Sequence, residues 1–168
     1  MDITFAVDAS GSVGEWGYSK EKDFVRKVVR QFGISRSGTH VAVIVFSTKA
    51  SVQIPLTRHF SYPSFFYAVG RLPYTRGVTR IDLALKTAAE EVFVEDGGSR
   101  SNVPKILILM TDGYQTRTAD SVALDKAILP LRAIGVQVYA LAIGRYIKDY
   151  ELRLIVEDRK STRLNSSH

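Results

Sequence analysis

The 168-residue chain fits one globular domain better than two. Its 45% hydrophobic and 24% charged residues exclude a disordered, collagenous or low-complexity protein, and no apolar run reaches the roughly 18 residues of a membrane helix. The net charge of +6 is scattered along the chain without a basic stripe, which argues against nucleic-acid binding, and the absence of cysteine excludes disulfides and thiolate metal sites.

Short apolar runs alternate with segments of helical periodicity along the chain. The first half predicts a strand at 3–7, a helix at 18–32, a second strand at 41–46, its antiparallel edge partner at 52–54 and a weaker helix at 60–72. The second half predicts a helix at 81–94, a central strand at 106–110, a helix at 121–134 that Pro130 kinks or divides, a strand at 136–143 and a last helix at 149–156. This alternation predicts a three-layer, doubly wound (Rossmann-like) α/β fold whose sheet is mostly parallel, with one antiparallel edge hairpin strand.

Hard oxygen ligands follow the predicted strands at three places. Asp8, Ser10 and Ser12 form a D-x-S-x-S run directly after the first strand, and Asp112 follows the strand at 106–110. Thr79 stands at the junction of a loop and the helix that begins at residue 81. Because ligands of an open parallel sheet bind at the carboxyl ends of its strands, these three loops are expected to converge.

The donor set indicates the kind of ion. Oxygen-only ligation without His or Cys selects a hard cation, with Mg²⁺ or Mn²⁺ first and Ca²⁺ next, and it argues against Zn²⁺. Two carboxylates at most balance a divalent ion, and if one of them acts only through water, the ion keeps residual positive charge and an open position. The carboxylate of a partner would fill that position.

Five segments of the chain carry these residues together with their flanking strands: DASGSVG, GISRSGTHVAVIVFS, GVTRIDLALKTA, NVPKILILMTDGYQT and LRAIGVQVYALAIG. They cover nearly all of residues 2–157 and resemble the von Willebrand factor type A domain with its metal-ion-dependent adhesion site. The resemblance implies a metal ligand at each of the five positions named above and a role in adhesion. Behind the metal threonine, the family often has T-x-T-G where this chain has Thr79-Arg80-Ile81-Asp82.

The resemblance is closest to the type A domains of extracellular-matrix and cell-surface proteins such as matrilins and non-fibrillar collagens. It implies a secreted parent whose signal peptide is not in this fragment, and a protein partner that supplies an Asp or Glu carboxylate, without nucleic-acid or direct membrane contact. Residues 158–168 resemble a translated sequencing adapter, and the family's last strand and C-terminal helix are expected to be missing. We therefore expect a truncated type A domain at 1–157 and an artefactual, disordered tail at 158–168.

Side chains around the proposed metal are candidates for partner contacts. Exposed aromatic residues are enriched at interfaces, and the predicted loops near the metal hold Trp16, Tyr18, Tyr74 and Tyr114. Arg76 and Arg80 flank Thr79 and would steer acidic ligands, although solvated loop residues are the simpler explanation. Packing against the first helix explains Trp16 equally well. The partner-binding set is Trp16, Tyr74, Arg76 and Tyr114.

An enzyme is not predicted, since the chain lacks the nucleotide-binding G-x-G-x-x-G and G-x-x-x-x-G-K-[ST] motifs and the G-x-S-x-G elbow of serine hydrolases. Other acids and histidines are expected on the surface or at strand ends rather than in a site: Asp82, Asp120, Asp125, His40 and His59. Two other functions stay open. One is an intracellular type A domain that scaffolds a multiprotein complex, and the other, less favoured, is a metal-dependent hydrolase.

Overall fold

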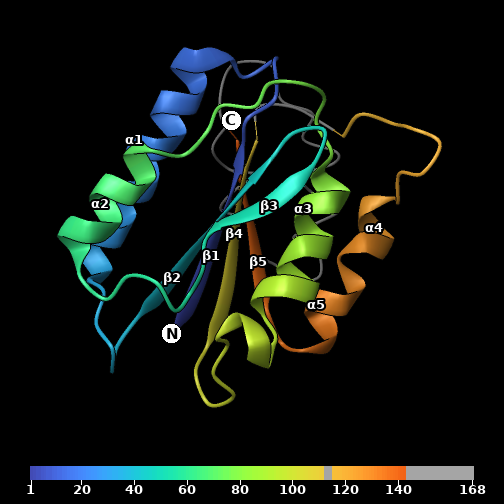
Figure 1. The fold of residues 1–168 in the computed structure, drawn as a ribbon. Coiled ribbons are helices and arrows are strands. Elements are labelled where there is room, and N and C mark those ends of the chain that lie inside the picture. Colours follow the sequence, from blue (N-terminus) through green and yellow to red (C-terminus); the bar gives the residue numbers. More distant parts are fainter. Residues whose placement is uncertain (112–114, 143–168) are drawn as a thin grey trace.

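The computed structural model describes residues 1–111 and 115–142, which form a five-stranded sheet between two layers of helices (Figure 1). The strands are β1 (Asp2–Asp8), β2 (His40–Phe46), β3 (Ala50–Ile54), β4 (Lys105–Thr111) and β5 (Gln137–Ala142). Their order across the sheet is β3-β2-β1-β4-β5, and neighbouring strands are parallel except β2 and β3. The predicted doubly wound fold with one antiparallel edge strand is confirmed.

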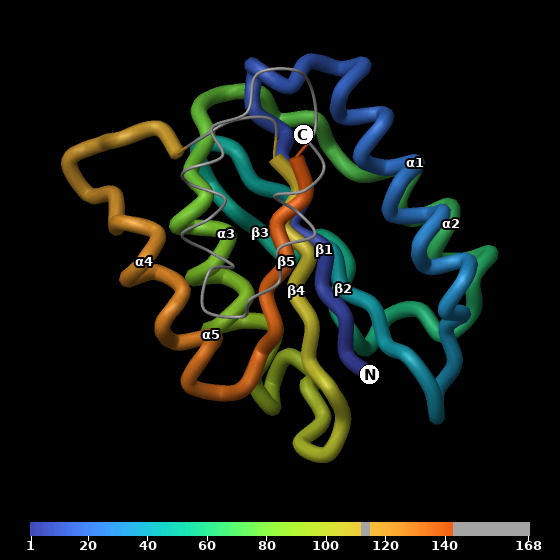
Figure 2. Tube along the Cα trace, turned by 180° about the vertical axis from the view of Figure 1, so that it is seen from behind, coloured from blue at the N-terminus to red at the C-terminus, as the bar shows by residue number. Residues whose placement is uncertain are grey.

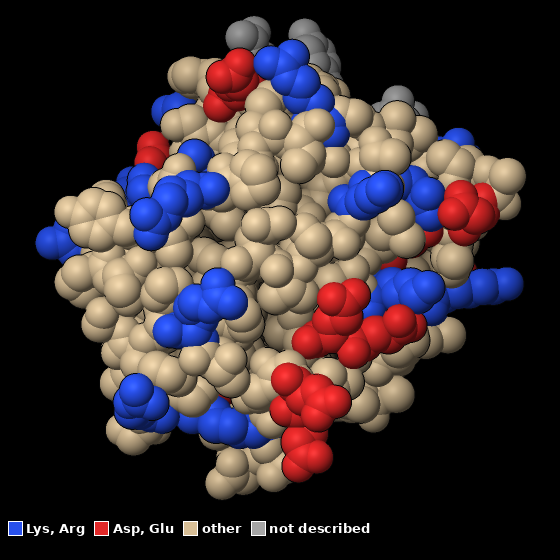
Figure 3. Space-filling model, viewed as in Figure 1, with Lys and Arg blue, Asp and Glu red and all other residues tan. Residues whose placement is uncertain are grey.

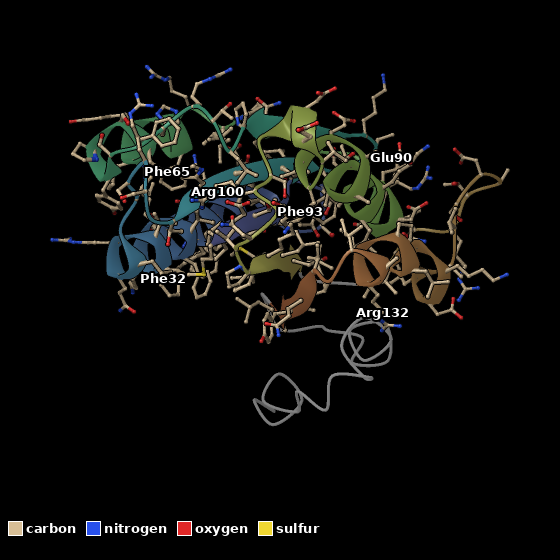
Figure 4. The ribbon with its side chains drawn as sticks, turned by 90° about the horizontal axis from the view of Figure 1, so that it is seen from below. Phe32, Phe65, Glu90, Phe93, Arg100 and Arg132 are labelled. Carbon is tan, nitrogen blue, oxygen red and sulfur yellow. The ribbon has the colours of Figure 1, made fainter. Side chains whose placement is uncertain are left out.

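Helices cover both faces of this sheet (Figure 2). One face carries α1 (Gly14–Phe32) and α2 (Tyr62–Gly70). The other carries α3 (Ile81–Thr87), the π-helical turn η1 (Ala88–Val92), α4 (Leu124–Ala127) and α5 (Leu129–Ala133), and the short turn η2 (Glu95–Gly97) follows η1. Each face has its own apolar cluster: Phe65 belongs to the cluster of α1 and α2, and Phe93 to the cluster of α3 to α5 (Figure 4).

The central strand explains why the sheet is covered twice. Every residue of β1 is buried, and successive side chains enter opposite clusters, as Phe5 and Ala6 do. A strand with two buried faces reads as a continuous apolar run, which is the pattern that identified it in the sequence. The parallel pairing of β1 with β2 and with β4 places the carboxyl ends of these three strands at one edge of the sheet.

The helices differ from the prediction in three places. α1 begins at Gly14 rather than at residue 18, because its first turn exposes Glu15 and Trp16 and so carries no apolar periodicity. The predicted helix at 81–94 changes into the π-helical turn η1 after Thr87. The helix predicted at 121–134 is divided at Ile128, with Pro130 in the first turn of α5, where its missing N–H costs no hydrogen bond.

A buried ion pair fixes the amino end of the sheet, opposite the proposed metal loops. Asp2 is fully buried, and its Oδ1 accepts hydrogen bonds from Arg100 Nε at 2.9 Å and Nη2 at 2.8 Å. The backbone N–H of Arg100 donates to Asp2 Oδ2 at 2.7 Å. Figure 4 views the molecule from below, and Arg100 is labelled there. Because a buried carboxylate is stable only with partners, this cluster accounts for the charge of Asp2 without a functional role.

Several predicted segments lie outside the described residues: the end of the strand at 136–143, the helix at 149–156 and the tail at 158–168. The domain boundary at residue 157 therefore stays a prediction. Among the described residues, no helix is both long enough and apolar enough to span a bilayer.

Candidate metal site

Asp8 ends β1 at the edge of the sheet where the predicted loops converge. Its side chain is fully buried, and both carboxylate oxygens are held. The backbone N–H of Ser10 donates to Asp8 Oδ1 at 2.9 Å, and Thr111 Oγ1, at the end of β4, donates to Asp8 Oδ2 at 2.6 Å. The two strands therefore aim this carboxylate jointly, because their parallel register brings their last residues side by side.

The hydroxyls of Ser10 and Ser12 form the second part of the site. Ser10 is buried and Ser12 is exposed, and their Oγ atoms lie 3.2 Å apart. Octahedral Mg²⁺ holds its ligands at about 2.0–2.1 Å, which places neighbouring ligand oxygens about 2.9 Å apart. The spacing of the two hydroxyls thus fits adjacent positions around a small hard cation.

Hydrogen bonds join the first loop to the loop that carries Thr79. The backbone N–H of Gly11 donates to the Gly77 carbonyl at 2.9 Å, and the Tyr74 hydroxyl donates to the Ser10 carbonyl at 3.1 Å. The two loops run together above the end of β1 in Figures 1 and 2. Thr79 itself is buried. Among the residues predicted as ligands, Ser10 contacts both Asp8 and Ser12, and Thr79 lies on the adjoining loop.

The fifth predicted ligand, Asp112, and the predicted contact residue Tyr114 lie outside the described residues. The chain is described again from Gln115, and there Thr116 exchanges two hydrogen bonds with Thr79. The backbone N–H of Thr79 donates to Thr116 Oγ1 at 3.1 Å, and the backbone N–H of Thr116 donates to the Thr79 carbonyl at 2.8 Å. The segment after β4 is therefore fastened to the Thr79 loop just beyond Asp112.

Within residues 1–111 and 115–142, no three His, Cys, Asp or Glu side chains gather into a metal-binding group. The described part of the site consists instead of one carboxylate and neutral hydroxyl oxygens. This donor set suits a hard divalent cation, and it leaves such an ion with positive charge to attract a further anion.

A carboxylate that sequence reasoning missed lies behind the site. Glu21 of α1 is fully buried, and its Oε1 accepts a hydrogen bond from the Asp8 backbone N–H at 2.8 Å. The signal was present in the sequence, because Glu21 stands three residues after Tyr18 and four before Val25, on the apolar face of the helix. Glu21 thus fixes the backbone from which the Asp8 side chain projects.

Tyr18 does not lie in a loop, as predicted, but on the buried face of α1. The prediction failed because the helix begins one turn earlier than its apolar pattern. Burial, together with the nearby Glu21 carboxylate, raises the pKa of Tyr18, so its phenol stays protonated and donates to the Pro73 carbonyl at 2.8 Å. Tyr18 therefore supports the loop that leads to Tyr74 and is not available to a partner.

Arg80 and Asp82 are also not the solvated side chains that the sequence predicted. Both are buried, and Arg80 Nε and Nη2 donate to Asp82 Oδ1 at 2.9 Å and Oδ2 at 3.0 Å. The prediction was wrong because the later segment at 115–122 packs over this charged pair at the start of α3 and shields it from water.

That segment completes what we call the Arg80 clamp, formed by Arg80, Asp82, Gln115, Asp120 and Val122. Gln115 Oε1 accepts the Asp82 backbone N–H at 2.6 Å, and Asp82 Oδ2 accepts the Val122 backbone N–H at 3.0 Å. Arg80 Nη1 donates to Asp120 Oδ1 at 3.3 Å. Asp120 is exposed, as predicted, although in a loop, and the Thr118 hydroxyl and Arg80 lower its pKa. The clamp holds the residues beside Thr79 against the segment that follows β4.

The predicted partner-contact residues differ in exposure. Trp16 is 75% exposed in the first turn of α1, so packing against the helix does not explain it, and Lys20 Nζ lies 4.7 Å from the centroid of its ring. Tyr74 is half-buried, and its hydroxyl is used to hold Ser10. Arg76 is exposed and forms an ion pair with Glu15 at 3.4 Å. Trp16 and Arg76 are thus accessible at the rim of the site.

The two histidines among the described residues, His40 and His59, lie away from the site. His40 is the buried first residue of β2, at its amino end, with Nε2 2.8 Å from the Arg36 carbonyl. His59 follows β3 and is 3.0 Å from the Ser64 hydroxyl. The prediction of a strand end for His40 is confirmed, and Asp125 is exposed on α4, also as predicted.

Comparisons with known proteins agree with this architecture. The family model of the von Willebrand factor type A domain matches residues 2–167, a range that includes all of the predicted tail except its last residue. Matrilin-3 of Gallus gallus is 32% identical over 148 residues, which are 86% of this chain and 32% of that protein. Cochlin of Bos taurus is 27% identical over 148 residues, which are 88% of this chain and 26% of that protein. The chain thus spans a third or less of these relatives.

Among solved structures, proximal thread matrix protein 1 from the mussel byssus, with a zinc-occupied MIDAS motif, superposes with a TM-score of 0.82. It is 29% identical, and the superposition covers 92% of this chain and 38% of that one. That protein holds zinc in its MIDAS motif, whereas the oxygen-only donors of this chain led us to expect a hard cation. By its sequence, its sheet order and the family model that matches nearly its whole length, the chain belongs to the von Willebrand factor type A domain family.

Proposed function

We propose that this chain is a protein-binding module that holds a divalent cation and binds a partner's carboxylate through it. The observation that carries the proposal is the buried Asp8 carboxylate, fixed at the end of β1 beside two serine hydroxyls 3.2 Å apart. The proposed ligands are the five residues predicted from the sequence: Asp8, Ser10, Ser12, Thr79 and Asp112. A bound ion would supply a positive charge for the partner's Asp or Glu.

Each described ligand has a distinct task in this proposal. Asp8 provides the negative charge that attracts the cation, and its hydrogen bonds from Ser10 and Thr111 keep it from rotating away. Ser10 and Ser12 supply neutral oxygens, which leave the charge of the ion only partly balanced. Thr79 supplies a hydroxyl from a second loop. We propose Mg²⁺ or Mn²⁺ as the ion, with Ca²⁺ next, and the zinc of the mussel relative makes Zn²⁺ a necessary member of any metal series.

We further propose that the module works in an extracellular matrix or at a cell surface and that it is not an enzyme. Support for the location comes from the resemblance to matrilin-3, cochlin and the mussel byssus protein. Support for a binding role comes from the site, where the described side chains offer oxygen donors and where neither His40 nor His59 lies. Trp16, Tyr74, Arg76 and Tyr114 are the proposed partner contacts, and Trp16 has the most accessible ring of those described.

Peptide display tests the proposed carboxylate contact without a known partner. A library of random peptides is selected on the immobilised full chain in Mg²⁺ and eluted with EDTA. We expect the eluted peptides to share an Asp or Glu, because an ion that keeps residual positive charge favours an anionic ligand at its open position. Changing that residue to Asn or Gln should abolish binding measured by surface plasmon resonance.

The matched control is the same selection eluted with EDTA that was presaturated with Mg²⁺. It should release few peptides, because the chelator then leaves the site loaded. Peptides that stay bound in free EDTA, or that share no acid, would show that recognition uses another surface.

We also propose that the domain ends at residue 157, although the family match runs to residue 167. Residues 158–168 hold one leucine and four Ser or Thr hydroxyls, so they offer little apolar surface to a core. Deleting 158–168 should leave the melting temperature unchanged within about 2 °C, measured by differential scanning calorimetry. A deletion that unfolds the chain would mean that these residues belong to the native domain.

A further inference from the structure

A groove lies beside the proposed metal site, between the β2–β3 hairpin and the loop that precedes Thr79. Its volume is about 430 Å³, and its walls include Lys49 and Arg76 together with the hydroxyl residues Ser47, Thr48 and Thr75. Lys49 and Arg76 are exposed, and no acid is among the described residues that line it. The groove is therefore an accessible, positively charged surface.

Backbone contacts make the groove continuous with the metal loops. The Gly77 carbonyl accepts a hydrogen bond from Gly11, which stands between Ser10 and Ser12. The Ser47 carbonyl accepts the Arg80 backbone N–H at 3.0 Å, next to Thr79. One wall of the groove is thus hydrogen-bonded to the loops of the proposed ligands. A chain segment bound at the metal passes into this groove if it continues over Gly77.

The loop that presents Arg76 is held in an uncommon conformation. Arg76 has φ 62°, the only positive φ of a non-glycine residue in residues 1–111 and 115–142, and such a conformation costs of order 1 kcal/mol or more. Ser47 Oγ lies 2.6 Å from Thr75 Oγ1, and the Val78 backbone N–H donates to Thr48 Oγ1 at 3.2 Å. A side chain at Gly77 would clash with Thr48. The hairpin thus fixes the backbone that turns Arg76 outward.

Charge is divided along the edge strand β3. The groove with Lys49 meets its first residues, Ala50 and Ser51, whereas a second pocket at Val52 is lined by Glu91 and Asp96. On the face shown in Figure 3, the largest group of carboxylates gathers over the segment after α3, and basic side chains are spread over the rest. An acidic segment is therefore attracted to the groove with Lys49 and repelled from the pocket with Glu91 and Asp96.

Lys49 forms no ion pair with any described residue, and the one ion pair of Arg76 with a described residue is its exposed pair with Glu15, beside the Tyr74 ring 5.5 Å away. An exposed pair of this kind is weak and is easily exchanged for another carboxylate. We propose that this groove binds a second acidic side chain of the same partner segment, so that the partner is a peptide with two acids, one at the metal and one between Lys49 and Arg76. This inference rests on the proposed function, because the first acid is the one that the metal binds.

The metal-selected peptides test this directly, through the residues that flank the acid required for metal binding. We expect a second Asp or Glu to be enriched at a fixed offset, and its replacement by Gln to weaken binding to the full chain about three- to tenfold at 0.1 M salt, and less at 0.5 M. The Lys49→Gln/Arg76→Asn variant should bind the diacid and its Gln form within twofold of each other. Asparagine is chosen because it tolerates the positive φ of residue 76.

A second groove supplies a matched control at the other end of β3. It is lined by Arg58, Arg71 and His59, and burial together with the two arginines lowers the pKa of His59, so two cations remain at neutral pH. Arg58→Gln/Arg71→Gln removes the same net charge and should keep the preference for the second acid. Lys49→Glu should reverse it and select a basic residue at the same offset.

Removing the competing acid gives a gain of affinity that a merely structural role does not produce. Glu15→Gln frees Arg76 and removes a like charge, so the diacid peptide should bind about two- to threefold tighter. Metal-dependent peptides with one acid and no enriched second acid would overturn this inference and leave the proposed function intact. Peptides without any required acid would overturn the proposed function itself.

Discussion

Asp82→Ala is expected to lower the free energy of unfolding by about 3 kcal/mol, because it leaves the Arg80 guanidinium buried without its bidentate partner. The side chains of Arg80 and Asp82 are 7% and 2% exposed, so water cannot replace the lost carboxylate. We take the lower end of the range for breaking a buried pair, since Asp120 still accepts a hydrogen bond from Arg80. Urea unfolding followed by circular dichroism measures the change.

Two further variants make this prediction specific to the ion pair. Asp125→Ala removes an exposed carboxylate from α4 and should change stability by no more than about 0.5 kcal/mol. Arg80→Met/Asp82→Ala removes both charges and should be more stable than Asp82→Ala alone, because no lone charge stays buried. If Asp82→Ala unfolds at the same urea concentration as Asp125→Ala, the Arg80 clamp does not stabilise the domain.

The clamp also shows what a single sequence cannot reveal. Arg80 and Asp82 precede and begin a helix, and their local pattern is that of ordinary surface residues. Their burial depends on Gln115 and Val122, which arrive 33 and 40 residues after Asp82 along the chain. Periodicity reports which face of an element is apolar, but it does not report which later loop will cover a charged one. Such pairings are set by tertiary contacts alone.

The strands and the position of the proposed ligands were predictable for the opposite reason. β1 is buried on both faces and β4 has Ile106 and Ile108 half-buried on one face, so their apolar runs mark them directly, and the polar residues after them must lie at one edge of the sheet. The place of Asp8, Ser10 and Ser12 at that edge follows from their position after β1, whereas their role as ligands was implied by the family resemblance and stays a proposal. Glu21 was within reach as well, since it interrupts the apolar face of α1. The exposed first turn of that helix, with Trp16, carried no such pattern.

Asp8→Asn is expected to weaken binding of Mg²⁺ and Mn²⁺ by more than roughly 100-fold. Loss of a residue that merely supports a metal ligand costs 10- to 100-fold in affinity, and Asp8 is the proposed charged ligand itself. Asparagine keeps the size of the side chain, and its carbonyl can still accept the Ser10 N–H that Asp8 Oδ1 accepts now. The fold should therefore persist while the charge that attracts the cation is lost. Isothermal titration calorimetry with each metal measures the affinity.

A graded series separates the site from a general effect of charge. Thr111→Val removes the hydroxyl that donates to Asp8 Oδ2 and should cost 10- to 100-fold, because the carboxylate loses its orientation. Asp125→Asn removes the same charge from an exposed position on α4 and should leave the affinity unchanged. Equal affinities for the wild type and Asp8→Asn would place the metal elsewhere or nowhere. A loss in Asp125→Asn as large as in Asp8→Asn would reduce the effect to net charge. We do not expect this result, because 0.15 M salt screens exposed charges over about 8 Å.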